Sequence, residues 1–282
     1  RIAIDGDFHL GNLGSFRGPD GKPAWGINDY DQAAKGSPAI DLERFATSLV
    51  LQARAQGVSP ADQQKLAQTF GETYLKTMDD LAHGQKNPGA WLDSHEAQGK
   101  VADLLDKADQ TKRKDLLKDL VKGEDGPSPQ FKRSDRLQDV SSQQQSDVKA
   151  ALADYAKHLP SGAGVKVPLQ VLDVVAREGS GGSSFGLPRF WALVANDTPG
   201  KLPVILELKQ APPSPLVDLS GNPASFDAKA MMANEKAMGG QANPLSGDCK
   251  VAGTSMMVRE IEPEKDSLDL TKLNHTGELE AL

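Results

Sequence analysis

The first 31 residues place polar side chains between short apolar stretches, and this pattern constrains the fold more than any other feature. This pattern predicts a strand, a tight loop, a second strand, a turn and a third strand, in which residues 2–4 and 25–27 are apolar and turn-forming residues occupy positions 18–21. A hairpin of this kind brings the polar residues at its two ends together. The sequence therefore predicts that the chain opens with a hairpin that carries a polar site.

Beyond the hairpin, the apolar spacing is first that of helices. A helix is expected at 41–56, ending at Gly57, and another at 60–81, where Ser59 precedes a proline. The charged stretch 93–160 is expected to form exposed, peripheral, mobile helices around a loop at 123–129.

The spacing then changes to that of strands. Three apolar runs separated by turn residues predict an antiparallel meander, followed by one helix and a last strand. The expected ranges are 169–176, 190–195 and 204–208 for the meander, 224–238 for the helix and 255–261 for the last strand.

These elements predict an α+β fold, and 282 residues are enough for one large domain or two lobes with a substantial core. Four segments are expected. They are 1–92 with the polar site and the helices of a large lobe, 93–160 with the charged helices, 161–265 with a small antiparallel sheet, and 266–282 as the start of a further segment.

The composition of the chain disfavours several classes of binding partner and site. A net charge of −7 disfavours nucleic acid, whose binding depends on Lys and Arg. Cys249 is the only cysteine, so neither an intrachain disulfide nor a cysteine zinc site can form. No apolar run reaches the roughly 18 residues of a membrane span. The compartment stays open, with a soluble, cytoplasmic protein as the expectation, and we expect further residues before Arg1, because Met is missing there.

The polar residues of the hairpin suit phosphoryl transfer. Asp7 and Asn12 are five positions apart in a short loop after a strand, the spacing of the catalytic Asp and metal-binding Asn in kinases. Asp29 follows the last strand of the hairpin, with Asp31 close behind. We expect Asp7 to act on the acceptor, and Asn12, Asp29 and Asp31 to bind Mg²⁺ or Mn²⁺. Each residue alone can equally be a turn residue.

His9 has two readings. An imidazole in such a loop can brace backbone carbonyl groups, or it can take part in the chemistry beside Asp7. Both are kept, and His9 is counted with the catalytic residues.

A phosphate-binding segment is expected much later in the chain. Glycine lets backbone amides approach phosphate oxygens, and a Gly-rich loop lies between two expected strands, although it can also be a flexible turn. Its candidate nucleotide-binding residues are Gly179, Ser180, Gly181, Gly182, Ser183, Ser184 and Gly186.

Lys209 ends the third strand of the meander, where kinases present a phosphate-binding lysine. It can also be a strand end that reaches solvent. Glu235, on the following helix, is the expected ion-pair partner of Lys209, and Asp227 competes for that role. For Arg259 the sequence leaves a structural role and a substrate contact open.

Two families resemble these motifs. The string Gly6-Asp7-x-His9-x-x-Asn12 resembles the loop of aminoglycoside phosphotransferases and choline kinases, and Ile27-x-Asp29-Tyr30-Asp31 resembles their metal-binding segment. The longer pattern resembles the bacterial domain of unknown function 2252, over most of the chain. Its residues are Gly6-Asp7-x-His9-Leu10-x-Asn12-x-Gly14, Asn28-Asp29-Tyr30-Asp31-x-Ala33, Asp41-Leu42-x-Arg44-x-Ala46-x-Ser48-Leu49 and Val258-Arg259-Glu260.

The resemblance implies a two-lobed, protein-kinase-like fold in rearranged order, because the Gly-rich loop and Lys209 follow the catalytic loop. The meander would then pack as a small lobe over the hairpin, with Lys209 in one cleft with Asp7 and Asp29. One departure is Asp5, which stands where the phosphotransferases have His. Asp41 can cap the helix that it opens or brace the catalytic loop, and by resemblance Asp41 and Arg44 support that loop.

The expected function is an ATP- and Mg²⁺-dependent phosphotransferase with an unknown small-molecule or protein acceptor. Transfer of AMP would use nearly the same residues, and a non-catalytic nucleotide-binding or scaffold domain is a further alternative. A metal hydrolase that uses His9 is disfavoured, because the other histidines show no ligand spacing. They are His83, His95, His158 and His275.

Overall fold

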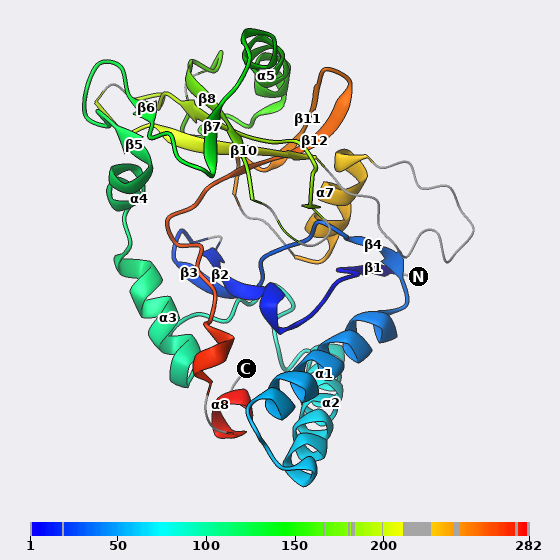
Figure 1. Cartoon of the computed structure of the whole chain (residues 1–282). Coiled ribbons are helices and arrows are strands. Elements are labelled where there is room, and N and C mark those ends of the chain that lie inside the picture. Colours follow the sequence, from blue (N-terminus) through cyan, green and yellow to red (C-terminus); the bar gives the residue numbers. More distant parts are fainter. Residues whose placement is uncertain are drawn as a thin grey trace. The chain divides into compact units, whose positions relative to one another are not determined.

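The chain forms two compact units in a computed structural model (Figure 1). Unit 1 comprises Arg1–Gln110, Ala237–Gly240 and Glu264–Leu282, and unit 2 comprises Thr111–Lys236 and Gln241–Pro263. The structure describes residues 2–18, 20–165, 167–179, 181, 184–198, 200–210, 227–239, 243–273 and 276–280. Helices and strands both contribute to the fold, which confirms the predicted α+β class. None of the helices in the described ranges is long and apolar enough to cross a bilayer.

The strands of unit 1 form two small antiparallel pairs. Strand β1 (Ile2–Ile4) pairs with β4 (Ala34–Gly36), and β2 (Leu13–Arg17) pairs with β3 (Pro23–Ile27). The β2–β3 pair is the predicted hairpin, closed by Gly21 at φ 81°. A position with positive φ favours glycine, so the turn forms where the sequence places this residue.

Two long helices support these strands. Helix α1 (Pro38–Ala55) has Ser37 as its N-cap and begins three residues before the predicted start, and α2 (Pro60–Ala82) follows the predicted cap Ser59. In both helices a proline occupies the first turn, where its missing N–H costs nothing. The other helices of unit 1 are α3 (Gly99–Gln110), the 3-10 helix η4 (Leu270–Lys272) and α8 (Thr276–Glu280).

The core of unit 1 lies between these helices and the hairpin. Its buried members come from all parts of the unit and include Leu10, Trp25, Leu66, Leu105 and Leu273. The stretch that begins at Glu264, most of which was expected to start a further segment, returns to the hairpin. The Ser15 hydroxyl donates to the Glu264 backbone carbonyl at 2.6 Å, and the Ser15 amide donates to the Asp266 carbonyl at 2.9 Å.

Unit 2 is built on a six-stranded antiparallel sheet in the order β11-β12-β10-β9-β8-β7. The predicted meander is confirmed as β8 (Val171–Arg177), β9 (Arg189–Val194) and β10 (Val204–Gln210), and the last predicted strand is β12 (Thr254–Glu260). The sequence did not indicate β11 (Gly247–Val251). Helix α7 (Ala228–Ala237) lies between β10 and β11 in the chain, within the predicted range.

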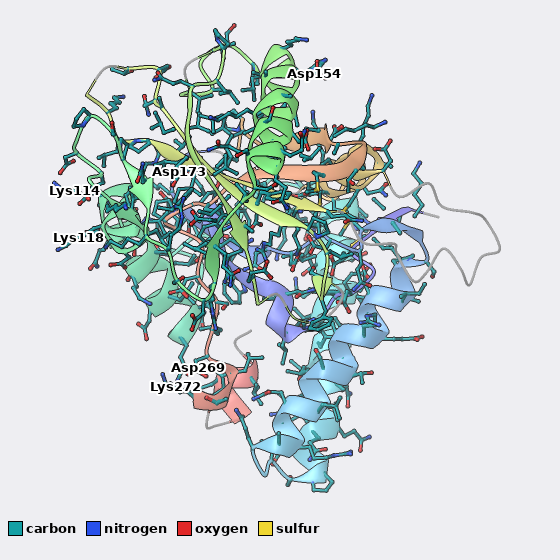
Figure 2. All side chains as sticks on the ribbon, turned by 45° about the horizontal axis from the view of Figure 1, so that its top comes forward. Lys114, Lys118, Asp154, Asp173, Asp269 and Lys272 are labelled. Carbon is teal, nitrogen blue, oxygen red and sulfur yellow. The ribbon has the colours of Figure 1, made fainter. Side chains whose placement is uncertain are left out.

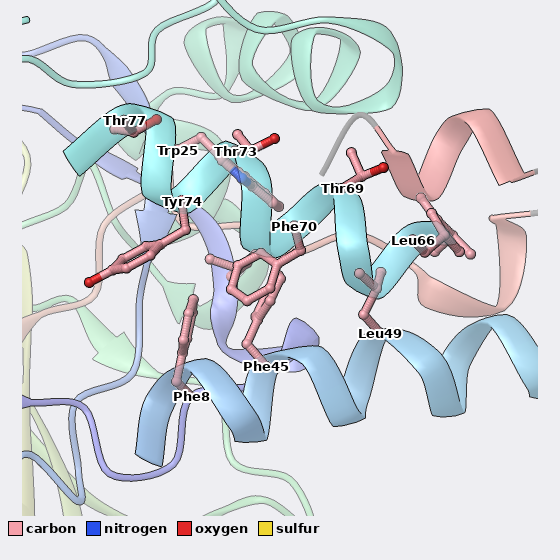
Figure 3. Close-up of a pocket in the computed structure, with 12 residues that line it drawn as sticks. Phe8, Trp25, Phe45, Leu49, Leu66, Thr69, Phe70, Thr73, Tyr74 and Thr77 are labelled. Carbon is pink, nitrogen blue, oxygen red and sulfur yellow. The ribbon is translucent and has the colours of Figure 1, made fainter. Parts of the chain in front are cut away.

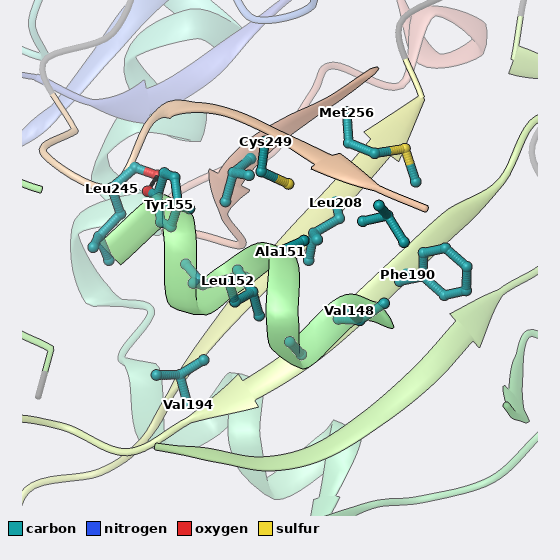
Figure 4. Close-up of a cluster of buried hydrophobic side chains, with 14 of the residues drawn as sticks. Val148, Ala151, Leu152, Tyr155, Phe190, Val194, Leu208, Leu245, Cys249 and Met256 are labelled. Carbon is teal, nitrogen blue, oxygen red and sulfur yellow. Dashed lines mark hydrogen bonds between the residues drawn. The ribbon is translucent and has the colours of Figure 1, made fainter. Parts of the chain in front are cut away.

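One face of this sheet packs against α5 (Ser142–Tyr155), as Figure 4 shows. Val148 and Leu152 of α5 are fully buried against the sheet, and the Tyr155 hydroxyl donates to the Leu245 carbonyl at 2.6 Å. A capping box of Ser141 with Gln144 fixes the start of the helix.

The charged stretch 93–160 is only partly as expected. Besides α3, α4 (Arg113–Leu120) and α5, it contains three short strands, β5 (Val121–Lys122), β6 (Gln130–Phe131) and β7 (Leu137–Asp139). Its apolar stripe contributes to both cores, because Leu105 is buried in unit 1 and Leu117 in unit 2. Charged side chains such as Lys114 and Asp154 lie on the exposed sides of their helices (Figure 2).

Candidate active site

The loop after β1 is held in place by Asp41 of α1. Its carboxylate accepts the backbone N–H of Asp5 at 2.8 Å through Oδ2 and that of Gly6 at 2.9 Å through Oδ1. The cap of α1 is Ser37, so the capping alternative for Asp41 is wrong and the bracing alternative is confirmed. Gly6 has φ 82°, which lets the chain leave the strand sharply.

Removing this brace should cost stability. In Asp41→Ala, two buried backbone N–H groups lose their acceptor, and we expect a loss of about 2–3 kcal/mol in the free energy of unfolding. Chemical denaturation of the variant and the wild type measures it. Glu43→Ala is the matched control, since it removes an exposed carboxylate from the same helix. Equal losses in both variants would mean that the two hydrogen bonds contribute nothing specific.

Asp7 points its carboxylate at three polar side chains. Gln32 donates to Oδ2 at 3.0 Å, Arg44 donates to Oδ1, and His9 Nε2 lies 3.9 Å from Oδ2. The Asp7 side chain is 28% exposed, so solvent or a ligand can reach it. The candidate catalytic carboxylate is therefore oriented and accessible at once.

Asn12 closes the same loop. Its side-chain Nδ2 donates to the Asp7 carbonyl at 2.9 Å, and its backbone amide donates to the His9 carbonyl at 2.8 Å. A second tie comes from α1, where Ser48 Oγ accepts the Leu10 amide at 3.1 Å. With Nδ2 engaged, the side-chain oxygen of Asn12 is left as an acceptor.

His9 braces the loop, but through a different group than expected. Its Nδ1 accepts the Gly11 amide at 3.0 Å and caps the 3-10 helix η1 (Leu10–Asn12). The prediction of a contact with backbone carbonyls is therefore wrong in the kind of group. Because Nδ1 is the acceptor, the proton of a neutral imidazole lies on Nε2, the nitrogen nearer Asp7.

The hairpin brings the second carboxylate segment to this loop. Strand register pairs Leu13 with Ile27, and the Asn28 amide donates to the Asn12 carbonyl at 3.0 Å. Asp29 is the next residue and is partly exposed. Asp31 is buried in a turn closed by the Ala33 amide and the Tyr30 carbonyl at 2.9 Å.

A metal ion here would need an amide oxygen in addition to carboxylates. Within the described ranges, no three His, Cys, Asp or Glu side chains gather in a group that could hold a metal ion. Asn12 and Asp29 offer one amide oxygen and one carboxylate, and Mg²⁺ accepts such a sparse set when phosphate oxygens and water complete it.

Asp5 is the most unusual group of the site. It is fully buried, and in the part of the chain that the structure describes neither of its carboxylate oxygens has a hydrogen-bond partner. Burial, and then the negative charges of Asp41, Asp29 and Asp7, raise its pKa to about 8. Asp5 is thus largely protonated at neutral pH in the folded chain, whereas an Asp in the unfolded chain is ionised.

This difference predicts a pH-dependent stability. The folded state binds a proton more tightly than the unfolded state, so the free energy of unfolding should fall as pH rises from about 4 to about 8, by a few kcal/mol. In Asp5→Asn this contribution disappears. The stability of Asp5→Asn relative to wild type, measured by denaturation with EDTA present, should therefore increase steadily over that range. A constant difference would show that Asp5 does not change its protonation on unfolding.

An apolar cavity of about 310 Å³ lies in unit 1, lined by α1 and α2 (Figure 3). Phe8 lines this cavity and stacks on Phe45, with ring centroids 4.6 Å apart. The ring centroids of Phe45 and Phe70 are 4.8 Å apart. Phe8 stands between Asp7 and His9 in the chain. The aromatic contacts therefore anchor the loop on its apolar side while its neighbours make the polar contacts.

The Gly-rich loop of unit 2 joins β8 and β9, as predicted. Gly179 and Gly186 have φ 75° and 73°, which only glycine adopts easily, and Phe185 is 79% exposed. Gly181 is exposed and Ser184 is buried, whereas Ser180, Gly182 and Ser183 lie outside the described residues.

Lys209 is the penultimate residue of β10 and only 9% exposed, so the alternative of a strand end in solvent is wrong. Glu235 of α7 is fully buried and accepts Arg259 Nη2 at 3.1 Å. This ion pair gives Arg259 a structural contact. The pairing of Glu235 with Lys209 stays a prediction, as does the competing role of Asp227, whose carboxylate accepts the Lys229 amide at 3.1 Å.

Sequence reasoning missed the polar neighbours of Lys209. Glu207, two residues earlier on the same face of β10, accepts Arg189 Nε at 2.6 Å and Trp191 Nε1 at 2.8 Å. Arg177 lies 5.4 Å from the Trp191 ring, and burial, then Arg189 and Arg136, lower its pKa. The period of two in a strand was the available signal, since it places Glu207 and Lys209 on one face.

In unit 1 the sequence gave no signal for Gln32, which is buried and donates to the Asp7 carboxylate. Only the fold brings it to Asp7.

A family model matches residues 1–282, and its description reads "Uncharacterized protein conserved in bacteria (DUF2252)". Searches of curated proteins and of solved structures gave no match. Since the family model spans the whole chain, the protein belongs to this bacterial family, as its opening motifs predicted.

Proposed function

We propose that the chain is a kinase-like phosphotransferase that uses ATP and Mg²⁺ or Mn²⁺ to phosphorylate an acceptor. One observation carries the proposal. The loop that holds Asp7 is fixed by the Asp41 carboxylate, and its own Asn12 closes it by binding the Asp7 carbonyl. A solvated turn has no need for such bracing, whereas a catalytic carboxylate must be held in one orientation.

Unit 2 supports the proposal through the order of its elements. A Gly-rich loop joins the first two strands of the meander, a lysine is on the third, and a helix with a buried glutamate follows. Protein kinases use the same order for the segments that cover and bind the phosphates of ATP. We propose that Lys209 and the amides around Gly179 and Gly186 bind these phosphates.

The chemistry of unit 1 follows from its contacts. Asp7 accepts the proton of the acceptor hydroxyl while the hydroxyl oxygen forms a bond to the γ-phosphorus and the bond from that phosphorus to the β,γ-bridging oxygen breaks. The products are ADP and the phosphorylated acceptor. Asn12 and Asp29 would hold the metal ion, which supplies positive charge to the phosphate oxygens. Gln32 keeps the Asp7 carboxylate oriented.

Transfer of AMP would use the same carboxylates, but it gives different products from phosphoryl transfer. An analysis of the products therefore distinguishes the two reactions. The purified protein is incubated with Mg²⁺ and ATP labelled on the α- or the γ-phosphate, and products are analysed by mass spectrometry. Phosphotransfer releases ADP and moves the γ-label, whereas AMP transfer releases pyrophosphate and moves the α-label. If the protein neither binds nor consumes ATP, the proposal is ruled out and a scaffold role is favoured.

A further inference from the structure

Arg44 occupies a position that holding the loop does not require. It follows Asp41 by three residues on α1, so both side chains lie on the helix face beneath the loop. Asp41 binds backbone amides, whereas Arg44 binds the Asp7 carboxylate itself. The Arg44 side chain is 46% exposed, which is more than Asp7 or His9.

Almost half of the Arg44 side chain is exposed to solvent. Arginine has five N–H donors in a planar fork, and Nη2 is the atom that binds Asp7. Among the residues that the structure describes, Asp7 is its only side-chain partner. His9 Nε2 lies 3.9 Å from the other oxygen of the same carboxylate, Oδ2, and the His9 side chain is 39% exposed. Two donors thus flank the approach to Asp7.

The contact of Arg44 with Asp7 bears directly on the chemistry proposed for Asp7. Arg44 donates to Oδ1 and Gln32 to Oδ2, so an acceptor hydroxyl has to share a carboxylate oxygen with one of them unless that partner moves away. Gln32 is buried, whereas Arg44 is exposed and has a long, flexible stem. Arg44 is therefore the partner that can be exchanged more readily, and an anion is the group that competes best with Asp7 for a guanidinium.

We propose that Arg44 binds an anionic group of the acceptor, so that the substrate is a hydroxyl compound carrying a carboxylate or a phosphate near the reacting hydroxyl. The anion takes the guanidinium from Asp7, and the hydroxyl then meets the freed Oδ1. A planar guanidinium suits both anions, since it can donate two parallel hydrogen bonds. The inference rests on the proposed function for the role of Asp7, but not for the binding of the anion.

Binding without nucleotide tests this directly. Calorimetry at low ionic strength, with EDTA and no ATP, compares glycerol, choline, glycerate and glycerol 3-phosphate as neutral, cationic, carboxylate and phosphate probes. We expect the wild type to bind at least one of the two anionic probes about tenfold more tightly than glycerol and choline. The two anionic arms show which anion the site takes. Equal or weaker binding of both anions would overturn the inference.

Variants separate anion binding from a merely structural ion pair. Arg44→Ala should abolish the preference for anions, and Arg44→Lys should keep part of it, because it retains the charge but not the fork. Arg54→Ala, which removes an exposed arginine from the same helix, should bind as the wild type does. If Arg44→Ala binds the anionic probes as tightly as the wild type, Arg44 only orients Asp7 and the inference fails.

The proposed function can fail independently. Should the anionic probes bind through Arg44 while labelled ATP is not consumed, the anion site stands and the phosphotransferase proposal falls. If ATP is consumed but Arg44→Ala leaves anion binding unchanged, the phosphotransferase proposal stands and the anion site at Arg44 falls.

Discussion

Replacing Asp7 by Asn is expected to lower the rate of ADP formation about 10²- to 10⁴-fold, because the amide cannot take the proton of the attacking hydroxyl. Affinity for ATP with Mg²⁺ should stay within about twofold, since Asp7 acts on the acceptor and not on the nucleotide. Turnover is measured by ADP release and affinity by calorimetry, on the same preparations.

The fold should survive this change. The Asp7–Arg44 ion pair is partly exposed, and such pairs contribute at most about 1 kcal/mol. Asp103→Asn is the control, because Asp103 is an exposed carboxylate of α3 in the same unit. Comparable turnover in Asp7→Asn and wild type would remove Asp7 from the mechanism. A parallel loss of nucleotide affinity would instead make it a metal or phosphate ligand.

The local pattern of the sequence was enough to predict the main elements. Hairpin turn residues, apolar spacing and the cap at Ser59 gave the β2–β3 hairpin, the two long helices and the meander of unit 2. These signals are local, since a turn or a cap is specified by a few neighbouring residues. The two-residue strands β5 and β6 are too short to show a period and were missed.

Contacts distant in sequence could not be predicted in the same way. The packing of the stretch that begins at Glu264 on Ser15 joins residues 249 positions apart, and no pattern near either residue indicates it. The charged stretch looked peripheral because most of its residues are polar, yet a few of its apolar side chains, such as that of Leu117, are buried. Burial depends on which faces meet, and the sequence of one helix does not show its neighbour.

For the candidate site, the spacing of Asp7 and Asn12 was visible, whereas the partners of Asp7 were not. Asp41 had two open roles until the structure showed its carboxylate on two backbone amides. The same structure explains why Asp5 stands apart. Three further carboxylates surround a buried one, so it holds a proton that an exposed Asp would release.

Asp29→Ala should abolish the Mg²⁺ dependence of ATP binding. The hairpin places Asp29 one residue beyond Asn28, whose amide binds the Asn12 carbonyl, so Asp29 supplies the carboxylate and Asn12 the amide oxygen of the proposed metal site. Without the carboxylate, the only protein ligand left for the doubly charged metal ion is the neutral amide oxygen of Asn12. We expect affinity for ATP in the presence of Mg²⁺ to fall at least about 100-fold, or about 2.7 kcal/mol.

Calorimetry with ATP in Mg²⁺ and in EDTA measures the effect as a ratio for each variant. The ratio should be large for the wild type and close to one for Asp29→Ala, while Asp29→Asn, which keeps an oxygen ligand without its charge, should lie between them. Asp103→Ala removes an exposed carboxylate elsewhere in unit 1 and should keep the ratio of the wild type. If Asp29→Ala keeps it as well, Asp29 is a turn residue and the metal is held elsewhere.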